Sequence, residues 1–308
     1  METLKPESVT FLVVDFLLSE KLKEIESDRT SGASQIARNA LAVLEYFVQT
    51  TKTSSHEEFI DGFNKVGKLL FLARPNMAVV QNLVAQTVYE VNRYPDSRLE
   101  AVRNFALTKL DELTTQSITA VQDSAKHAAK LIGDYARVAS CSYSSTIVET
   151  MKQAKQQRKS FTVYVAESKS IDNRYRYGED LANSLRSIGV DAEVFSDNQI
   201  AEYIQKTGLV LVGADSLLFD GSVVNGTPTC ALAVAAKQCG LPFYCVCETA
   251  KANVNSYLGK SVETKTGFDF VPAELVTGVV TENGILDVKG VVKVMKRNSK
   301  FFEVFVSV

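Results

Sequence analysis

Residues Gly208 to Lys251, with the sequence GLVLVGADSLLFDGSVVNGTPTCALAVAAKQCGLPFYCVCETAK, decide the fold of this chain. The apolar run 209–212, which lies between two glycines, is typical of a strand buried on both faces. Apolar residues at helical spacing predict a helix over 227–239, and the run 242–247 predicts a second strand. The stretch is therefore one strand–helix–strand unit of a parallel sheet.

A carboxylate stands where the first of these strands ends. Asp215 closes the tripeptide Gly-Ala-Asp, and a loop over 219–227 leads to the helix. In that helix Thr227 is the expected N-cap and Pro228 the first residue. Ligands of open parallel α/β sheets bind outside the carboxyl ends of the strands. Asp215 therefore fits two roles, contact with a ligand or capping of its own loop, and the sequence leaves both open.

The composition is that of an ordinary globular protein. The length of 308 residues predicts two domains, and 45% hydrophobic with 23% charged residues can form a sizeable core. A net charge of −2 and a pI of about 5.9 give no sign of a nucleic-acid-binding face. No apolar run is long enough to span a membrane, and the acidic start does not resemble a signal peptide. We therefore expect a cytoplasmic protein with neither nucleic acid nor membrane as a partner.

The cysteines and histidines do not form a metal-binding pattern. The odd count of five cysteines predicts reduced thiols, and Cys245 and Cys247 alternate on the buried face of one strand. The two histidines, His56 and His127, fall in polar or amphipathic helical surroundings, so both are predicted to be solvent-exposed. We expect no metal site, no histidine-based catalytic triad and no cofactor.

Helical periodicity fills residues 1–135, and alternating strands and helices fill residues 136–308. Helices are predicted over 9–26, 34–50, 57–72, 77–93, 97–132, 145–156, 177–187, 198–205 and 227–239. Strands are predicted over 137–140, 160–166, 191–195, 209–212, 242–247 and 275–281. Strands that alternate with helices form a parallel sheet covered on both faces. The predicted fold class is therefore α/β, preceded by a helical domain.

Four loop-to-helix junctions are rich in hydroxyl groups, glycine or arginine. They are residues 29–32, 73–76, 140–145 and 225–229. Helix N-termini present free backbone N–H groups and a partial positive charge, and both favour phosphate. Ordinary capping explains each junction alone. The four together, with two arginines, make a phosphorylated small molecule the expected ligand.

Five stretches resemble one protein family: DRTSGASQIARNAL, ARPNMAVVQNL, SCSYSSTIVETM, VGADSLLFDGSVVN and FDFVPAELVTGVVTENGI. From about Asp28 to Ile285 the chain resembles the α, β and δ regulatory subunits of translation initiation factor 2B. That superfamily also contains methylthioribose-1-phosphate isomerase and ribose-1,5-bisphosphate isomerase. The resemblance implies a helical domain over 1–135, a Rossmann-like domain over 136–308, and a dimer through the latter.

The isomerases of this superfamily use an aspartate and a cysteine as acid and base. By resemblance, Asp215 occupies the aspartate position, whereas the cysteine position falls on Ser142, with Cys141 one place earlier. A serine hydroxyl is a far weaker acid than a thiol. This departure counts against catalysis, although a re-aimed loop would bring Cys141 into use.

The phosphate-binding positions of the isomerases are also retained only in part. By resemblance, Arg74 and Asn225 match ligand-binding positions, but Gly226 replaces a lysine. Ser31 stands in place of an arginine, with Arg29 two residues away. Loss of two cations removes two charge-assisted contacts to a phosphate.

We therefore expect a non-catalytic protein, similar to a regulatory subunit, that binds a phosphorylated sugar or nucleotide between its domains. The alternative is an aldose–ketose isomerase of a phosphorylated pentose, with Asp215 and Cys141 as the acid/base pair. The expected ligand-binding residues are Arg29, Ser31, Gly32, Arg74, Ser142, Ser144, Asn225 and Asp269.

The end of the chain bears on assembly. The tail 301–308, FFEVFVSV, alternates apolar residues, which predicts an added edge strand. An exposed apolar edge strand is an aggregation hazard unless another surface covers it. We therefore expect a homodimer, or an assembly with related subunits, in which this tail lies at or near the contact.

Overall fold

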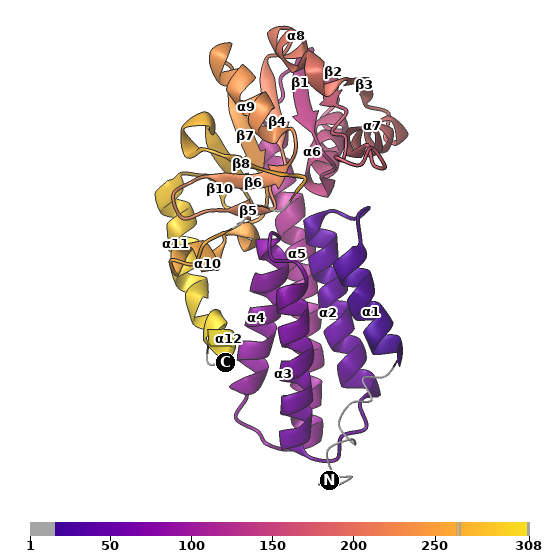
Figure 1. Ribbon diagram of the computed structural model, residues 1–308, viewed down its shortest axis with the longest axis vertical. Coiled ribbons are helices and arrows are strands. Elements are labelled where there is room, and N and C mark those ends of the chain that lie inside the picture. Colours follow the sequence, from indigo (N-terminus) through magenta and orange to yellow (C-terminus); the bar gives the residue numbers. More distant parts are fainter. Residues whose placement is uncertain (1–15, 263, 265, 307–308) are drawn as a thin grey trace, which may run out of the picture.

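The computed structural model describes residues 16–262, 264 and 266–306. Its first part is a helical region of five helices: α1 (Phe16–Ser27), α2 (Ala33–Thr50), α3 (His56–Ala73), α4 (Ala78–Asn92) and α5 (Leu99–Ala129). They run roughly side by side along the long axis of the molecule (Figure 1). The predicted beginning of the first helix, 9–15, lies outside the described residues.

One apolar stripe on each helix forms the core of this region. In α2 the predicted stripe between Ala40 and Val48 is buried. Phe47 packs against Phe59 and Phe63 of α3, with ring centroids 5.9 and 6.2 Å apart. Because full burial of a phenylalanine contributes about 2–3 kcal/mol, this cluster fixes α3 against α2.

A seven-stranded sheet follows, with the order β10-β9-β7-β4-β1-β2-β3. Neighbouring strands are parallel, except that β10 is antiparallel to β9. The strand order reverses between β1 and β4, which is where ligands bind in sheets of this kind. The strands are β1 (Ala136–Cys141), β2 (Phe161–Ala166), β3 (Asp191–Phe195), β4 (Leu209–Val212), β7 (Phe243–Val246), β9 (Gly278–Thr281) and β10 (Gly284–Leu286).

The helices of this part of the chain are α6 (Ser145–Gln156), α7 (Tyr177–Ser187), α8 (Ile200–Gln205), α9 (Thr229–Gln238), α10 (Val254–Tyr257) and α11 (Val288–Asn298). The predicted α/β class is thus confirmed, and the observed bounds of β3, β4, α6 and α7 equal the predicted ones. The change from helices to sheet occurs at β1, whose first residue is Ala136. A division into separate domains at that point stays a prediction.

A small antiparallel sheet, in the order β5-β6-β8, corrects the prediction for 219–227. Its strands are β5 (Ser216–Leu217), β6 (Val223–Gly226) and β8 (Phe268–Val271), so the predicted loop contains a strand. The start of α9 also differs from the prediction, since Pro228 is the N-cap residue and the helix begins at Thr229. Asp269 holds this turn, since its carboxylate accepts hydrogen bonds from Thr227 Oγ1 and Cys230 N, both at 2.9 Å.

The tail does not form the predicted edge strand. Residues Ser299–Phe302 form a 3-10 helix and Glu303–Val306 form α12, while residues 307–308 lie outside the described part. This segment returns to the helical region (Figure 1), where Phe302 packs edge-on against Phe71, with ring centroids 5.3 Å apart. The apolar residues 301, 302 and 305 share one side of a helix, so helical packing prevailed over the alternating pattern.

Two further findings concern single predictions. Both histidines, His56 and His127, are partly buried, contrary to the prediction of exposure. The Nδ1 of His127 donates a hydrogen bond to the carbonyl oxygen of Thr281 at 2.8 Å. No helix within the described ranges is long and apolar enough to cross a membrane.

Candidate functional site

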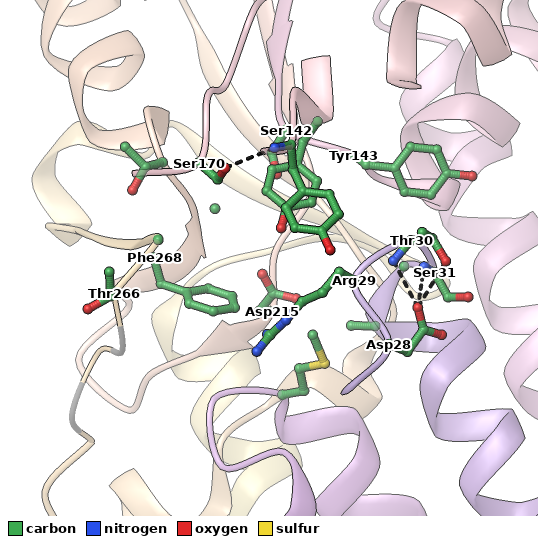
Figure 2. Close-up of a pocket in the computed structure, with 18 of the residues that line it drawn as sticks. Asp28, Arg29, Thr30, Ser31, Ser142, Tyr143, Ser170, Asp215, Thr266 and Phe268 are labelled. Atoms are coloured by element: carbon green, nitrogen blue, oxygen red, sulfur yellow. Dashed lines mark hydrogen bonds between the residues drawn. The ribbon is translucent and has the colours of Figure 1, made fainter. Parts of the chain in front are cut away.

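A cavity of about 420 Å³ lies between the helical region and the carboxyl ends of β1 and β4, at the reversal of strand order. Figure 2 shows Arg29, Ser142 and Asp215 facing the same hollow. The predicted site residues that line it are Arg29, Ser31, Gly32, Arg74, Ser142 and Asp215.

The loop before α2 directs one arginine into this cavity. The carboxylate of Asp28 accepts hydrogen bonds from the backbone N–H groups of Thr30 and Ser31, at 2.8 and 2.9 Å. Burial alone would raise the pKa of Asp28, but these hydrogen bonds lower it, so the carboxylate stays ionised and holds the turn. Within the described part of the chain, the exposed guanidinium of Arg29 forms no hydrogen bond or ion pair and is available to an anion.

The N-termini of α2 and α6 approach each other beside the cavity. Gly32, the N-cap residue of α2, has no side chain to accept from the first turn, and Gly32 and Ala33 line the cavity. A Cβ atom on Gly32 would lie 3.0 Å from the Oγ of Ser145 in α6. Because a helix N-terminus carries a partial positive charge, this corner favours a negatively charged group.

Arg74 is a structural cation at the wall of the cavity. Its side chain is buried and donates from Nε to the carbonyl oxygen of Ile25, at 2.7 Å, and from Nη2 to that of Asp28. Burial, together with the nearby Arg29 cation, lowers the pKa of Arg74. Its donors thus hold the end of α1, and its positive charge stands at the wall of the cavity.

Asp215 lies among buried charges. Burial raises the pKa of its carboxyl group to about 6, although the cations of Lys251 and Arg74 oppose this rise. Lys251 is only 4% exposed. Burial alone would lower the pKa of Lys251, but the attraction of Glu248 and Asp215 raises it, so the amine stays protonated. Asp215 can therefore exchange a proton near neutral pH beside a fixed cation.

Glu248 connects this charge cluster to the helical region. Its side chain is fully buried, and its Oε1 accepts a hydrogen bond of 2.6 Å from the hydroxyl of Ser34 in α2. The other carboxylate oxygen, Oε2, has no hydrogen-bond partner among the described residues. An unpaired buried oxygen costs several kcal/mol, so the cation of Lys251 has to offset that cost.

Ser142 and Gly226 lie close together at the wall of the cavity. Ser142 lines the cavity with a positive φ of 58°, and its N–H donates to Ser168 Oγ at 2.8 Å. A Cβ atom on Gly226 would lie 2.4 Å from Ser142 Oγ. The serine hydroxyl therefore occupies the space through which a longer side chain at 226 would have to pass.

Cys141 does not reach the cavity. Its thiol is fully buried in the sheet core and lies 3.2 Å from Thr229 Oγ1. Burial raises the pKa of this thiol to about 12. The structure therefore does not bring Cys141 and Asp215 together as an acid/base pair, because the strand directs Cys141 into the core and Ser142 into the cavity.

Three predicted ligand-binding residues support the site from behind its wall. Ser144 caps α6 by accepting from Ile147 N at 3.3 Å. The Nδ2 of Asn225 donates to Thr229 Oγ1 at 2.9 Å, and Asp269 holds the turn before α9. These three residues lie close to the cavity, as predicted from their positions in the chain. Their polar atoms, however, form hydrogen bonds with backbone groups and neighbouring side chains instead of facing the cavity.

Sequence reasoning missed Lys251 and one whole wall of the cavity. Lys251 follows β7, the strand beside β4, and that placement was the available signal. The missed wall is the segment 169–177, which contributes Lys169, Tyr175 and Tyr177. The two tyrosine rings stack with centroids 5.9 Å apart. Phe268 and Tyr143 add further aromatic surface (Figure 2).

An ion-pair cluster anchors the segment 169–177. Glu167, at the end of β2, is 6% exposed and contacts Lys169 at 3.0 Å and Arg176 at 2.5 Å. After the segment, Gly178 packs directly against the end of β2: a Cβ atom at this position would lie 1.9 Å from the carbonyl oxygen of Ala166. Both ends of the segment are thereby fixed, and its middle faces the cavity.

Comparison with known proteins gives one consistent group. A sequence model of the Initiation factor 2 subunit family matches residues 29–267. An eIF-2B subunit 2-like protein of Pyrococcus abyssi is 30% identical over 279 residues, which cover 87% of this chain and 95% of that protein. A ribose 1,5-bisphosphate isomerase of Methanocaldococcus jannaschii is 23% identical, with 89% and 92% covered. The crystal structure of a translation initiation factor eIF-2B of Pyrococcus horikoshii superposes with a TM-score of 0.73 at 25% identity, covering 88% of this chain and 97% of that one.

Proposed function

Because the chain belongs to the Initiation factor 2 subunit family, we propose that it is a regulatory-subunit-like protein without isomerase activity. Its cavity binds a phosphorylated sugar or nucleotide. The contact between Ser142 and Gly226 is the observation that carries this proposal. By the resemblance, the isomerases use a thiol and an amine at these two positions, where this chain has a hydroxyl group and a hydrogen atom.

The remaining charges favour an anionic ligand. Arg29 is exposed in the cavity, Lys251 is a buried cation behind Asp215, and the start of α2 presents backbone N–H groups. A phosphate at this corner gains charge-assisted hydrogen bonds. Tyr175 and Tyr177 offer flat apolar surface on which a sugar face or a base packs.

Thermal denaturation with sugar phosphates and nucleoside monophosphates tests ligand binding. A ligand at 100 times its Kd stabilises the fold by about 2.7 kcal/mol, which raises the Tm by several degrees. Arg29→Ala should abolish this rise, and Arg137→Ala, at the opposite end of β1, should keep it. If no compound stabilises the wild type, or if both variants respond alike, the proposed site is wrong.

The isomerase alternative retains one favourable observation. Asp215 has a pKa of about 6, which suits a general acid or base near neutral pH. Incubation with ribose 1,5-bisphosphate or methylthioribose 1-phosphate, followed by NMR, measures turnover directly. Turnover that disappears in Asp215→Asn would support this function over the non-catalytic one. Cys141→Ala should leave such turnover intact, because the thiol is buried away from the cavity.

We also propose that the protein assembles as a homodimer or with related subunits. Apolar side chains of the sheet region remain exposed near the small sheet: Phe219 is 52%, Leu258 43% and Phe270 44% exposed. An obligate interface buries on the order of 2,000 Å² or more. Light scattering at micromolar concentration should give twice the mass of 33.8 kDa. A monomer in that experiment would exclude the homodimer.

A further inference from the structure

The helix α11 carries a stripe of cations that the cavity does not use. Its buried face consists of Val291 and Met295. At 100° per residue, Lys289, Lys293, Lys296 and Arg297 fall within roughly 100° of arc on the opposite face. Lys300 continues the stripe in the following 3-10 helix, and all five side chains are exposed. We call these five residues the basic stripe.

Helix stability does not account for the basic stripe. Like charges at i, i+4 spacing, such as Lys289 with Lys293, destabilise a helix by about 0.2–0.5 kcal/mol per pair. None of the five cations forms an ion pair with another described residue. The helix dipole favours Lys296 and Arg297 in the last turn but disfavours Lys289 in the first. The five cations of the stripe therefore repel one another, and an anionic partner would reduce this repulsion.

The surroundings of the basic stripe limit the size of that partner. Carboxylates bound it at both ends: Asp287 caps the start of α11, and Glu303 pairs with Arg93 at 3.6 Å beyond its end. From Lys289 to Lys300 the stripe spans about 17 Å. A long polyanion would extend past it onto these carboxylates, on a chain whose net charge is −2.

An exposed apolar residue borders the stripe at its first turn, since Val288 precedes Lys289 and is 41% exposed. Figure 1 shows α11 on the outer flank of the molecule, so the stripe is open to a partner. We propose that the basic stripe is a docking surface for a short acidic segment of another polypeptide that carries apolar residues among its carboxylates. A nucleic acid longer than the stripe would meet the carboxylates of Asp287 and Glu303, whereas a short peptide would not.

Fluorescence anisotropy in about 0.15 M salt tests the proposal, since that ionic strength screens weak distant attraction. The probe is a labelled peptide of about twelve residues with Glu-Leu-Glu repeats, matched to the length of the stripe. Lys293→Glu/Lys296→Glu should weaken its binding at least about tenfold. Lys52→Glu/Lys130→Glu, an equal charge change at exposed positions elsewhere, should leave binding unchanged. The neutral variant Lys293→Gln/Lys296→Gln should give an intermediate loss, which separates charge from folding defects.

Three results would overturn the proposal. The first is no saturable binding of the peptide by the wild type. The second is an equal loss in the stripe variant and in its control. The third is binding of poly(U), or of phosphatidylserine vesicles, at least as tight as that of the peptide, which would identify a nucleic acid or a membrane surface as the better partner.

Discussion

Replacing Asp215 with asparagine should change the pH dependence of folding. Burial raises the pKa of Asp215 from 3.8 to about 6. One pKa unit corresponds to about 1.4 kcal/mol, so a shift of about two units makes ionisation in the folded state cost about 3 kcal/mol. The folded wild type therefore binds this proton more tightly than the unfolded chain does.

The sign of the effect follows from this tighter binding. The contribution of the protonated carboxyl is fully present below pH 4 and is lost as the pH rises through 6. Asp215→Asn has no proton to lose at this position. The free energy of unfolding of the wild type should thus fall, relative to that of the variant, by roughly 2 kcal/mol between pH 4 and pH 7, because Asp215 of the unfolded chain is already partly ionised at pH 4. The attraction between Lys251 and the ionised carboxylate is already part of this effect, because that cation opposes the rise in the pKa of Asp215.

Urea denaturation of both proteins at several pH values measures this difference. Asp111→Asn, which removes an exposed carboxylate from α5, is the control and should alter stability by less than about 0.5 kcal/mol. A difference between Asp215→Asn and the wild type that stays constant from pH 4 to pH 7 would contradict the reasoning. A midpoint near pH 4 would show that Asp215 is solvated rather than buried.

Three substitutions test other parts of the structure. Gly226→Ala places a Cβ atom against Ser142 Oγ and should destabilise by about 1–3 kcal/mol in urea; Ser142→Gly in the same chain should restore most of that loss. Lys251→Met leaves buried carboxylates unpaired and should lower the unfolding free energy by about 3–5 kcal/mol at pH 7, and by less at pH 4. Phe302→Ala removes a 2% exposed ring from its contact with Phe71 and should cost about 3–5 kcal/mol by calorimetry; a cost under about 1 kcal/mol would mean that the tail contributes little.

Local patterns predicted the parallel strands of the main sheet and the helices α6 to α9, but not β10, α10 or α11. The β4 run 209–212 is apolar throughout and lies between glycines, so its bounds were readable from the sequence. The small sheet was not, because Val224 pairs with Phe270 across a long stretch of chain and neither strand shows a local period. The prediction of an edge strand over the tail was wrong for a related reason, since phenylalanines at 301, 302 and 305 suit one face of a helix as well as a strand.

The candidate site was predictable where backbone geometry fixes a side chain. Asp215 and Ser142 follow adjacent parallel strands, so their meeting at the cavity follows from topology. The adjacent Cys141 could not be placed, because one residue along a strand decides between core and cavity. Lys251 was missed because a buried lysine contradicts hydropathy, and only the neighbouring carboxylates make its burial favourable.

The return of the tail to the helical region bears on how the chain is made. Phe301 and Phe302 belong to the same core as the residues of α2, α3 and α4. During synthesis the helices leave the ribosome first, and the whole sheet region must follow before these two rings can be added. Until then the growing chain exposes the apolar groove that they will fill, which is the kind of surface that chaperones bind. Completion of the helical core thus waits for residues that are made after the whole sheet region.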